Sequence, residues 1–129
     1  MSENKKLSLT AQQPDIACSK IYSFIGLARK AGAVSPGEAL AEQAVKRERA
    51  YLVLLAQDAS ENTKKKIRTA LYKTDIPLLE FGNKADLGRM LGKTFFSVIA
   101  VTDKGFAERI MELIKQNCNN SVHGGGIFE

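Results

Sequence analysis

The chain has 129 residues, of which 44% are apolar and 26% charged, and it carries a net charge of +5 with a pI near 9.3. This length predicts one domain that buries its own core, and the composition excludes global disorder. No apolar segment is long enough to cross a membrane and the first residues lack a signal-peptide core, so we expect a cytoplasmic protein that does not enter a membrane. The two cysteines are far apart and match no metal-binding spacing, so we expect reduced thiols.

The first half of the chain alternates helix-like apolar periodicity with short apolar runs. Gly32 is placed to close the first helix in the left-handed conformation, and Ser60 is placed to cap the third. The apolar run over residues 51–56 is typical of a strand that helices cover on both faces. In chain order we expect a flexible tail over residues 1–14, a helix over 15–31, a short strand over 33–35, a helix after Gly37, the strand over 51–56 and a helix from Glu61.

The second half repeats this alternation and ends in a polar, glycine-rich segment. Asp103 is placed to cap the last helix, whose apolar residues recur at helical spacing. We expect a strand over residues 76–81, a short helix over 84–91, a strand over 97–101, a helix from Asp103 to 116 and a flexible tail over 117–129. Alternating helices and short apolar strands predict an α/β fold, a compact three-layer α/β/α sandwich over residues 15–116.

Signals for catalysis are few. The only histidine, His123, lies in the expected tail, where a positioned general base is not formed. The sequence has no nucleophile elbow, no phosphate-binding glycine-rich loop and no carboxylate cluster for a metal. Asp58 lies just after the carboxyl end of the strand over residues 51–56, where α/β folds bind ligands. For this carboxylate we favour capping of the turn into the next helix over catalysis. We therefore predict no catalytic residue, no metal and no cofactor.

Positive charge is concentrated in one part of the chain. Residues 20–73 hold eleven Lys or Arg against five Asp or Glu, a net charge of +6, so the remainder is nearly neutral. A basic half of this kind suits a polyanion such as RNA. A solvated helix face with unpaired lysines explains the same pattern without a ligand.

Four segments are expected to meet at one edge of the sandwich. They are the helix entry at Gly37, the Asp58 loop, the turn at Lys84 and the segment 92–96. Gly37 allows close approach of a backbone because it has no side chain. This edge is therefore the predicted ligand-binding edge.

Side chains near this edge could supply specific contacts. Glu38 and Gln43, which we place in the first turns of the second helix with Lys46, could accept hydrogen bonds from guanine edges, while Lys46 could meet a phosphate. Lys64 lies just inside the next helix, whose free N–H groups also favour phosphate. Phe95 or its neighbour could stack on an unpaired base, because alternation sends the two phenylalanines to opposite sides. Taken singly, each helix residue is better explained as a solvent-facing residue, and at least one of the two phenylalanines as a core residue.

The motifs LARKAG, GE, LVLLAQDAS and TKK occur in this order between Leu27 and Lys65. Over most of its length, residues 18–116, the chain resembles the kink-turn RNA-binding family of ribosomal proteins, and within it the bacterial YlxQ-like branch. The resemblance implies a mixed, roughly four-stranded sheet and binding of an RNA bulge flanked by sheared G·A pairs. It also implies that residues 37–43 enter the widened groove and that residues 93–96 cover a flipped-out base.

Some positions match the family pattern and others depart from it. Gly37 matches the family's glycine at the helix entry, and Lys84 matches a lysine that contacts RNA phosphate. The family's Asn-Glu pair, which reads the G·A pairs, falls on Ala39 and Leu40, and its following lysine falls on Gln43. The apolar base-covering loop is replaced by KTFF. We expect the fold and RNA binding to be kept and the reading of kink-turns to be weakened.

We therefore predict non-enzymatic binding of structured RNA, ribosomal or kink-turn-like, by a cytoplasmic, ribosome-associated monomer. Two alternatives stay open: an RNA-recognition module like that of ribose methyltransferases, and a protein-interaction domain for an acidic partner. The residues predicted to contact RNA are Gly37, Glu38, Gln43, Lys46, Asp58, Lys64, Lys84, Lys93, Thr94 and Phe95.

Overall fold

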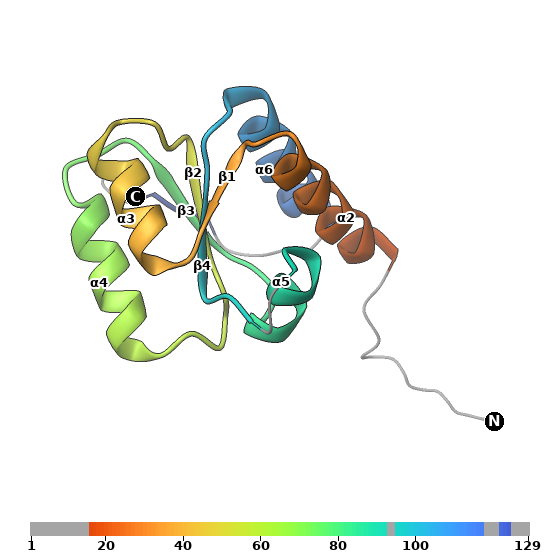
Figure 1. Cartoon of the computed structure of the whole chain (residues 1–129), viewed down its shortest axis with the longest axis horizontal. Helices are drawn as coiled ribbons and strands as arrows, with labels where there is room; N and C mark the ends of the chain where they lie inside the picture. The colour runs from red at the N-terminus through yellow and green to blue at the C-terminus, as the bar shows by residue number, and fades with distance from the viewer. Residues whose placement is uncertain (1–15, 93–94, 118–121, 125–129) are drawn as a thin grey trace.

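A computed structural model of the chain describes residues 16–92, 95–117 and 122–124. A sheet lies between two layers of helices, with α3 and α4 on one face and α2, α5 and α6 on the other (Figure 1). The predicted three-layer α/β/α sandwich is therefore confirmed. The elements in chain order are α2 (Ile16–Lys30), β1 (Val34–Pro36), α3 (Glu38–Lys46), β2 (Leu52–Leu55), α4 (Glu61–Leu71), β3 (Pro77–Glu80), α5 (Lys84–Met90), β4 (Val98–Val101), α6 (Lys104–Asn117) and β5 (Val122–Gly124).

The strands form a mixed sheet in the order β1-β4-β2-β3-β5. Strands β2 and β3 are parallel, and the other neighbours are antiparallel. The central strands β2 and β4 are buried at every position, and Leu52 lies opposite Val101 in their ladder. Helices cover both faces of these strands, which explains why their sequences are continuous apolar runs rather than alternating ones.

The fifth strand was not predicted. Residues 122–124 pair with β3, where His123 lies opposite Leu78, although a flexible tail was expected over residues 117–129. The edge of β3 offers unpaired backbone N–H and C=O groups, and these can pair with a short segment whatever its side chains. The strand was missed because the polar, glycine-rich sequence around His123 has no alternating apolar pattern that would predict it.

Three helix boundaries follow the predicted local chemistry. Gly32 adopts φ +76° after the end of α2. The Ser60 hydroxyl accepts a hydrogen bond from the Thr63 N–H at 3.1 Å, which caps α4. The Asp103 carboxylate accepts one from the Phe106 N–H at 2.9 Å, at the start of α6. These assignments are confirmed, because each depends on hydrogen bonds within one turn of the chain.

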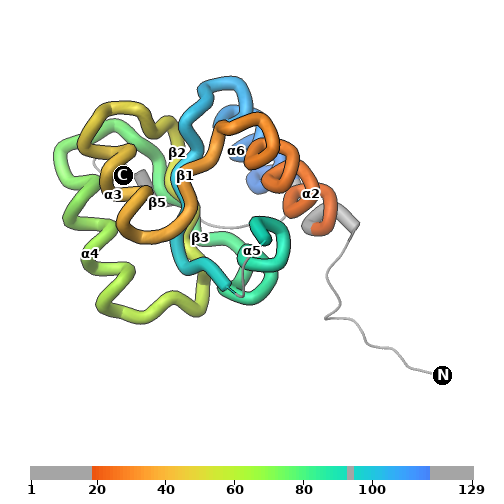
Figure 2. Tube along the Cα trace, in the orientation of Figure 1, coloured from red at the N-terminus to blue at the C-terminus, as the bar shows by residue number. Residues whose placement is uncertain are grey.

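Each helix fills the core with one apolar stripe. Ile25 of α2, Ile67 of α4, Leu87 of α5 and Ile110 of α6 are all buried against the sheet layer. The trace in Figure 2 shows that the chain enters α3, α4 and α5 at the same end of the sheet at which β4 begins. The packed helices thus hold several loops together at that end. Among the residues that the structure describes, no helix combines the length and the apolar character that a membrane span requires.

Candidate nucleic-acid interface

The loops at this end of the sheet form a surface that we call the rim. Strands β1, β2 and β3 end here and β4 begins here, as their pairing requires. The predicted meeting of the four segments is confirmed for the residues that the structure describes. The rim consists of Gly37, Asp58, Asn83, Lys84, Phe95 and Phe96.

Gly37 and Phe96 are in contact at the centre of the rim. Gly37 adopts φ +96° and ψ 156°, a conformation essentially restricted to glycine, and its N–H donates to the Val98 carbonyl oxygen at 2.8 Å. A Cβ atom at this position would lie 3.7 Å from Cε1 of Phe96. The Phe96 N–H donates to the Lys84 carbonyl oxygen at 3.1 Å. Phe96 therefore joins the entries of α3 and α5 and is the packed member of the phenylalanine pair.

Asp58 has a structural role that differs from the predicted one. Its Oδ1 accepts a hydrogen bond at 2.9 Å from the Lys84 N–H, in the first turn of α5. Asn83 caps the same helix by accepting from the Asp86 N–H at 2.8 Å. Because β2 and β3 are parallel neighbours, the loops that follow them meet, and Asp58 reaches α5. The expectation that Asp58 caps the turn into α4 is therefore wrong.

Phe95 and Lys84 form the exposed part of the rim. The Phe95 side chain is 57% exposed, and the Lys84 Nζ lies 5.6 Å from the centroid of its ring. An ammonium group over an aromatic face is a cation–π arrangement. The rim thus presents an aromatic face and a positive charge together, which are the groups that bind a base and a phosphate.

Two further predicted residues are engaged in ion pairs. The Glu38 carboxylate lies 3.4 Å from the Lys66 ammonium, so the first residue of α3 is tied to α4. The Lys64 Nζ lies 3.9 Å from a carboxylate oxygen of Glu80, and the Lys64 side chain is only 14% exposed. Arg68 also pairs with Glu80, at 3.3 Å. Lys64 therefore supports the attachment of α4 to β3, and its charge is partly compensated.

The remaining predicted residues lie elsewhere. Lys46 is the last residue of α3, about 12 Å along the helix axis from Glu38 at 1.5 Å per residue. The expectation that Lys46 lies in the first turns of this helix is therefore wrong, because the helix is only nine residues long. Gln43 is exposed on the same helix but faces a different depression. Lys93 and Thr94 lie outside the described residues.

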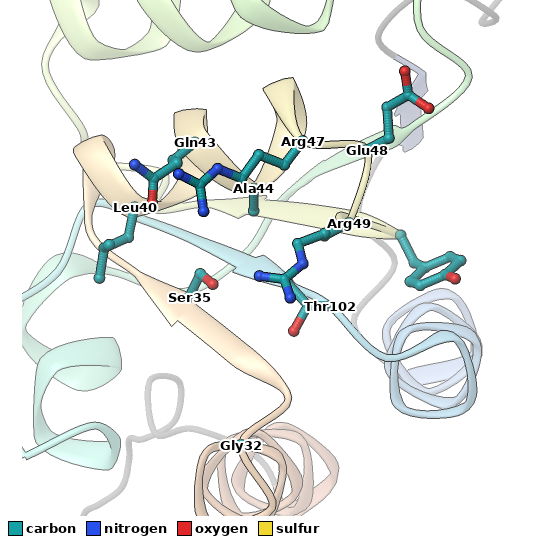
Figure 3. Close-up of a pocket in the computed structure, with 10 residues that line it drawn as sticks. Gly32, Ser35, Leu40, Gln43, Ala44, Arg47, Glu48, Arg49 and Thr102 are labelled. Carbon is teal, nitrogen blue, oxygen red and sulfur yellow. The ribbon is translucent and has the colours of Figure 1, made fainter.

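That depression lies between the C-terminal end of α3 and the β1 edge of the sheet, and we call it the hollow (Figure 3). It has a volume of about 450 Å³. Its polar lining consists chiefly of Ser35, Gln43, Arg47, Arg49, Tyr51 and Thr102, with Glu48 also at its edge.

Of the residues that line the hollow, only Gln43 was identified as a candidate site residue from the sequence. The three cations of KRER, residues 46–49, were a usable signal for a basic surface at the end of α3.

Comparison with known proteins finds related sequences that match most of the chain. Relatives include the RNA-binding protein YlxQ of Enterococcus faecium, 38% identical over 96 residues that make up 74% of this chain and 92% of that protein. The RNA-binding protein YlxQ of Bacillus subtilis (strain 168) is 40% identical over 93 residues, which are 72% of this chain and 93% of that protein.

Solved structures with the same fold are also known. A Bacillus halodurans C protein with unknown function has a TM-score of 0.71 and 38% identity, over 74% of this chain and 97% of that chain. The Giardia lamblia 15.5kD RNA binding protein shares the fold, with a TM-score of 0.63 and 19% identity over 80% of this chain and 88% of that chain. The model of the ribosomal protein L7Ae/L30e/S12e/Gadd45 family matches residues 19–111, so the chain belongs to this family.

Proposed function

We propose that the chain is a non-enzymatic protein that binds structured RNA, and that the rim is its primary contact. One observation carries the proposal: the rim combines a glycine at the entry of α3, an exposed aromatic ring and a lysine over that ring. The names of the YlxQ relatives, which are RNA-binding proteins, support it. We further propose that the protein acts as a cytoplasmic monomer.

The rim suits RNA for three chemical reasons. Gly37 allows a sugar-phosphate backbone to come close to the start of α3 because no side chain projects there. Phe95 offers a face on which an unpaired base can stack, as single-stranded RNA readers do. Lys84 can neutralise the phosphate next to that base. These groups recognise an irregular RNA, such as an internal loop, rather than a continuous duplex.

We propose a kink-turn-like or ribosomal RNA as the ligand, with only a small preference for kink-turns. Ala39 and Leu40 are exposed on α3, but their side chains carry no hydrogen-bonding group with which to read G·A pairs. The triple variant Ala39→Asn, Leu40→Glu and Gln43→Lys should increase the preference for a kink-turn over a straight duplex. Each base-reading pair adds about 1–3 kcal/mol, by analogy with DNA readout. Strong G·A-dependent binding by the natural chain would contradict this proposal.

We also propose that the protein performs no chemistry on RNA. The one suggestive carboxylate, Asp58, already accepts the Lys84 N–H and thereby supports α5. Labelled RNA incubated with the protein, with and without divalent metal and a methyl donor, should remain chemically unchanged. Cleavage or methylation that copurifies with the protein and is abolished by Asp58→Ala would overturn the proposal.

Fluorescence anisotropy tests the proposed function directly. A labelled hairpin containing a kink-turn and a straight duplex of equal length are titrated with the protein over a series of salt concentrations. Binding should weaken as salt rises, because phosphate contacts release counterions. Absence of binding to both RNAs at low salt would contradict the proposal. A nuclease-insensitive complex with an acidic protein would then favour the protein-interaction alternative.

A further inference from the structure

The hollow and the rim lie at opposite ends of the sheet. Strand β4 begins beside Phe96 at the rim and is followed by Thr102 at the hollow. Six residues of extended chain span about 20 Å at 3.3 Å per residue. Helix α3 runs in the same direction between the two places, from Gly37 to Arg47 (Figure 1). A ligand at the hollow therefore makes contacts that the rim does not make.

The end of α3 directs two arginines into the hollow. The Arg47 N–H donates to the Gln43 carbonyl oxygen at 2.9 Å, and the Arg49 N–H donates to the Ala44 carbonyl oxygen at 2.9 Å. Between them Glu48 adopts φ +59°, the left-handed conformation that ends a helix. Figure 3 shows both guanidinium groups directed toward the hollow, while the Glu48 carboxylate is directed away from it.

Both arginines are available to a ligand. Within the described ranges, neither guanidinium group forms an ion pair or a side-chain hydrogen bond. Three other arginines are paired with carboxylates, namely Arg68 with Glu80, Arg89 with Asp86 and Arg109 with Glu112, whereas Arg29 forms no ion pair with a described residue. Two unpaired guanidinium groups that share one concave surface favour an anion over a neutral ligand.

The other groups of the hollow narrow the class of anion. Ser35 and Thr102 supply hydroxyl groups, which can donate hydrogen bonds to phosphate oxygens. The Tyr51 side chain is 46% exposed and borders the hollow, so it offers an aromatic face beside the charges. A volume of about 450 Å³ lies within the range of small-ligand sites and can hold one nucleotide unit.

We propose that the hollow is a second RNA contact, which binds a backbone phosphate through Arg47 and Arg49 and the adjoining nucleotide against Tyr51. This proposal rests on the proposed function, since the same RNA would reach the hollow from the rim. An RNA that spans both places covers about 20 Å, so a short hairpin reaches only one of them and a longer one reaches both. The footprint on the RNA is therefore bipartite.

The test compares two arginine-to-alanine variants of the full chain. Arg49→Ala removes a charge from the hollow, and Arg109→Ala removes the same charge from α6, where Arg109 pairs with Glu112 at 2.7 Å. Affinity is measured by anisotropy for the labelled kink-turn hairpin with at least ten base pairs, over a salt series. Arg49→Ala should weaken binding about tenfold and reduce the slope of log K against log salt by about 0.7–0.9, as expected for one lost phosphate contact.

The control decides between a local contact and a loss of overall charge. Arg109→Ala should change the affinity and the salt slope much less than Arg49→Ala does. Equal effects of the two variants would overturn the proposal, even if the wild-type protein binds RNA normally. No binding by the wild-type protein would instead contradict the proposed function itself. Thermal unfolding of both variants checks that Arg49→Ala leaves the fold intact, and Arg49→Lys, which keeps the charge but loses the planar fork, should bind with intermediate affinity.

A spectroscopic measurement identifies the source of the phosphate. Amide resonances of Gly32 and Thr102, which line the hollow, should shift when the hairpin is added and shift less in Arg49→Ala. AMP, added alone at the same concentration as the hairpin, should leave these resonances unchanged. Shifts with AMP that equal those with the hairpin would assign the hollow to a free nucleotide and overturn its assignment to an RNA strand.

Discussion

The rim and the hollow both collect polar side chains at an end of the sheet, but they use these side chains differently. At the rim, Asp58 holds the start of α5, and Glu38, which follows Gly37 of the rim, is paired with Lys66. At the hollow, Arg47 and Arg49 form no such contact with any described residue. The polar groups of the rim therefore hold its loops in place, whereas the two guanidinium groups of the hollow stay unpaired.

This difference separates two kinds of RNA contact. A shaped surface with an exposed ring stacks an unpaired base, and because it has only one free cation its contribution to the salt slope is small. A pair of free guanidinium groups attracts any phosphate, and its contribution falls steeply as salt rises. We infer that the rim contributes most of the selectivity and that the hollow contributes most of the salt-dependent affinity. Four pairs of variants can break or sharpen this division.

The largest effect is expected from removing the exposed part of the rim. The double variant Lys84→Ala and Phe95→Ala should lower the affinity for the kink-turn hairpin by about 2–4 kcal/mol, since base stacking alone is worth about 1–3 kcal/mol. Its salt slope should change by less than about one, because only one cation is lost. Anisotropy over a salt series measures both quantities.

A matched control exists just after the end of α4. Tyr72 is 68% exposed and Lys73 lies 5.7 Å from the centroid of its ring, so this pair repeats the chemistry of the rim at another place. The double variant Tyr72→Ala and Lys73→Ala should leave hairpin affinity nearly unchanged. If both double variants weaken binding equally, the rim is not the primary contact.

Most of the fold could be predicted from the sequence because its strands and caps depend on local patterns. The run over 51–56 contains β2, and the strands predicted over 76–81 and 97–101 contain β3 and β4. Pro77 is the first residue of its strand, as expected for a residue that cannot donate in the ladder. Strand β5 was missed, because its pairing depends on a free edge of the sheet rather than on its own residues.

The candidate interface could be predicted only in part. Gly37, Lys84 and Phe95 meet at the rim because the strand order places their loops together. The partners of Asp58 and Lys64 could not be predicted, since these lie 26 and 16 residues away along the chain. A cation in the sequence gives no sign of whether a distant carboxylate compensates it. The unpaired state of Arg47 and Arg49 could not be predicted for that reason.

The next largest effect concerns stability and contrasts two glycines. Gly37→Ala at the rim should destabilise the protein by about 1–3 kcal/mol, because φ +96° with ψ 156° is essentially closed to residues with a Cβ. Gly32→Ala, at the hollow, has φ +76° and no atom within 4 Å of the added Cβ. Its cost should be smaller, about 1 kcal/mol, the usual penalty for the left-handed helical conformation. Urea unfolding measures both, and a larger loss for Gly32→Ala would refute this reading of the rim.

A smaller and opposite effect is expected at the edge of the hollow. Glu48→Gly should stabilise the protein by about 0.5–1 kcal/mol, because glycine adopts φ +59° without steric cost. It should also strengthen RNA binding at low salt, since a negative charge beside Arg47 and Arg49 is removed. Lys73→Gly is the control for the backbone effect, with φ +69° away from the hollow, although it removes a positive charge rather than a negative one. It should give a similar stability gain without stronger RNA binding. Unchanged or weaker RNA binding by Glu48→Gly would contradict the role of the hollow.

The smallest effect tests whether the Glu38–Lys66 ion pair limits the affinity for RNA near the rim. Glu38→Gln removes the carboxylate that holds the Lys66 ammonium at 3.4 Å, and both side chains are partly exposed, so stability should fall by only about 0–1 kcal/mol. The released Lys66 becomes a free cation beside the entry of α3, and RNA affinity should rise about two- to fivefold at low salt with a steeper salt slope.

Glu112→Gln frees Arg109 in the same way on α6 and provides the control for Glu38→Gln. A gain in affinity for Glu38→Gln that the control does not share would show that the Glu38–Lys66 ion pair beside the rim limits RNA binding there. Unchanged or weaker binding would mean instead that the Glu38 carboxylate itself contacts the RNA or that Lys66 lies beyond the ligand's reach.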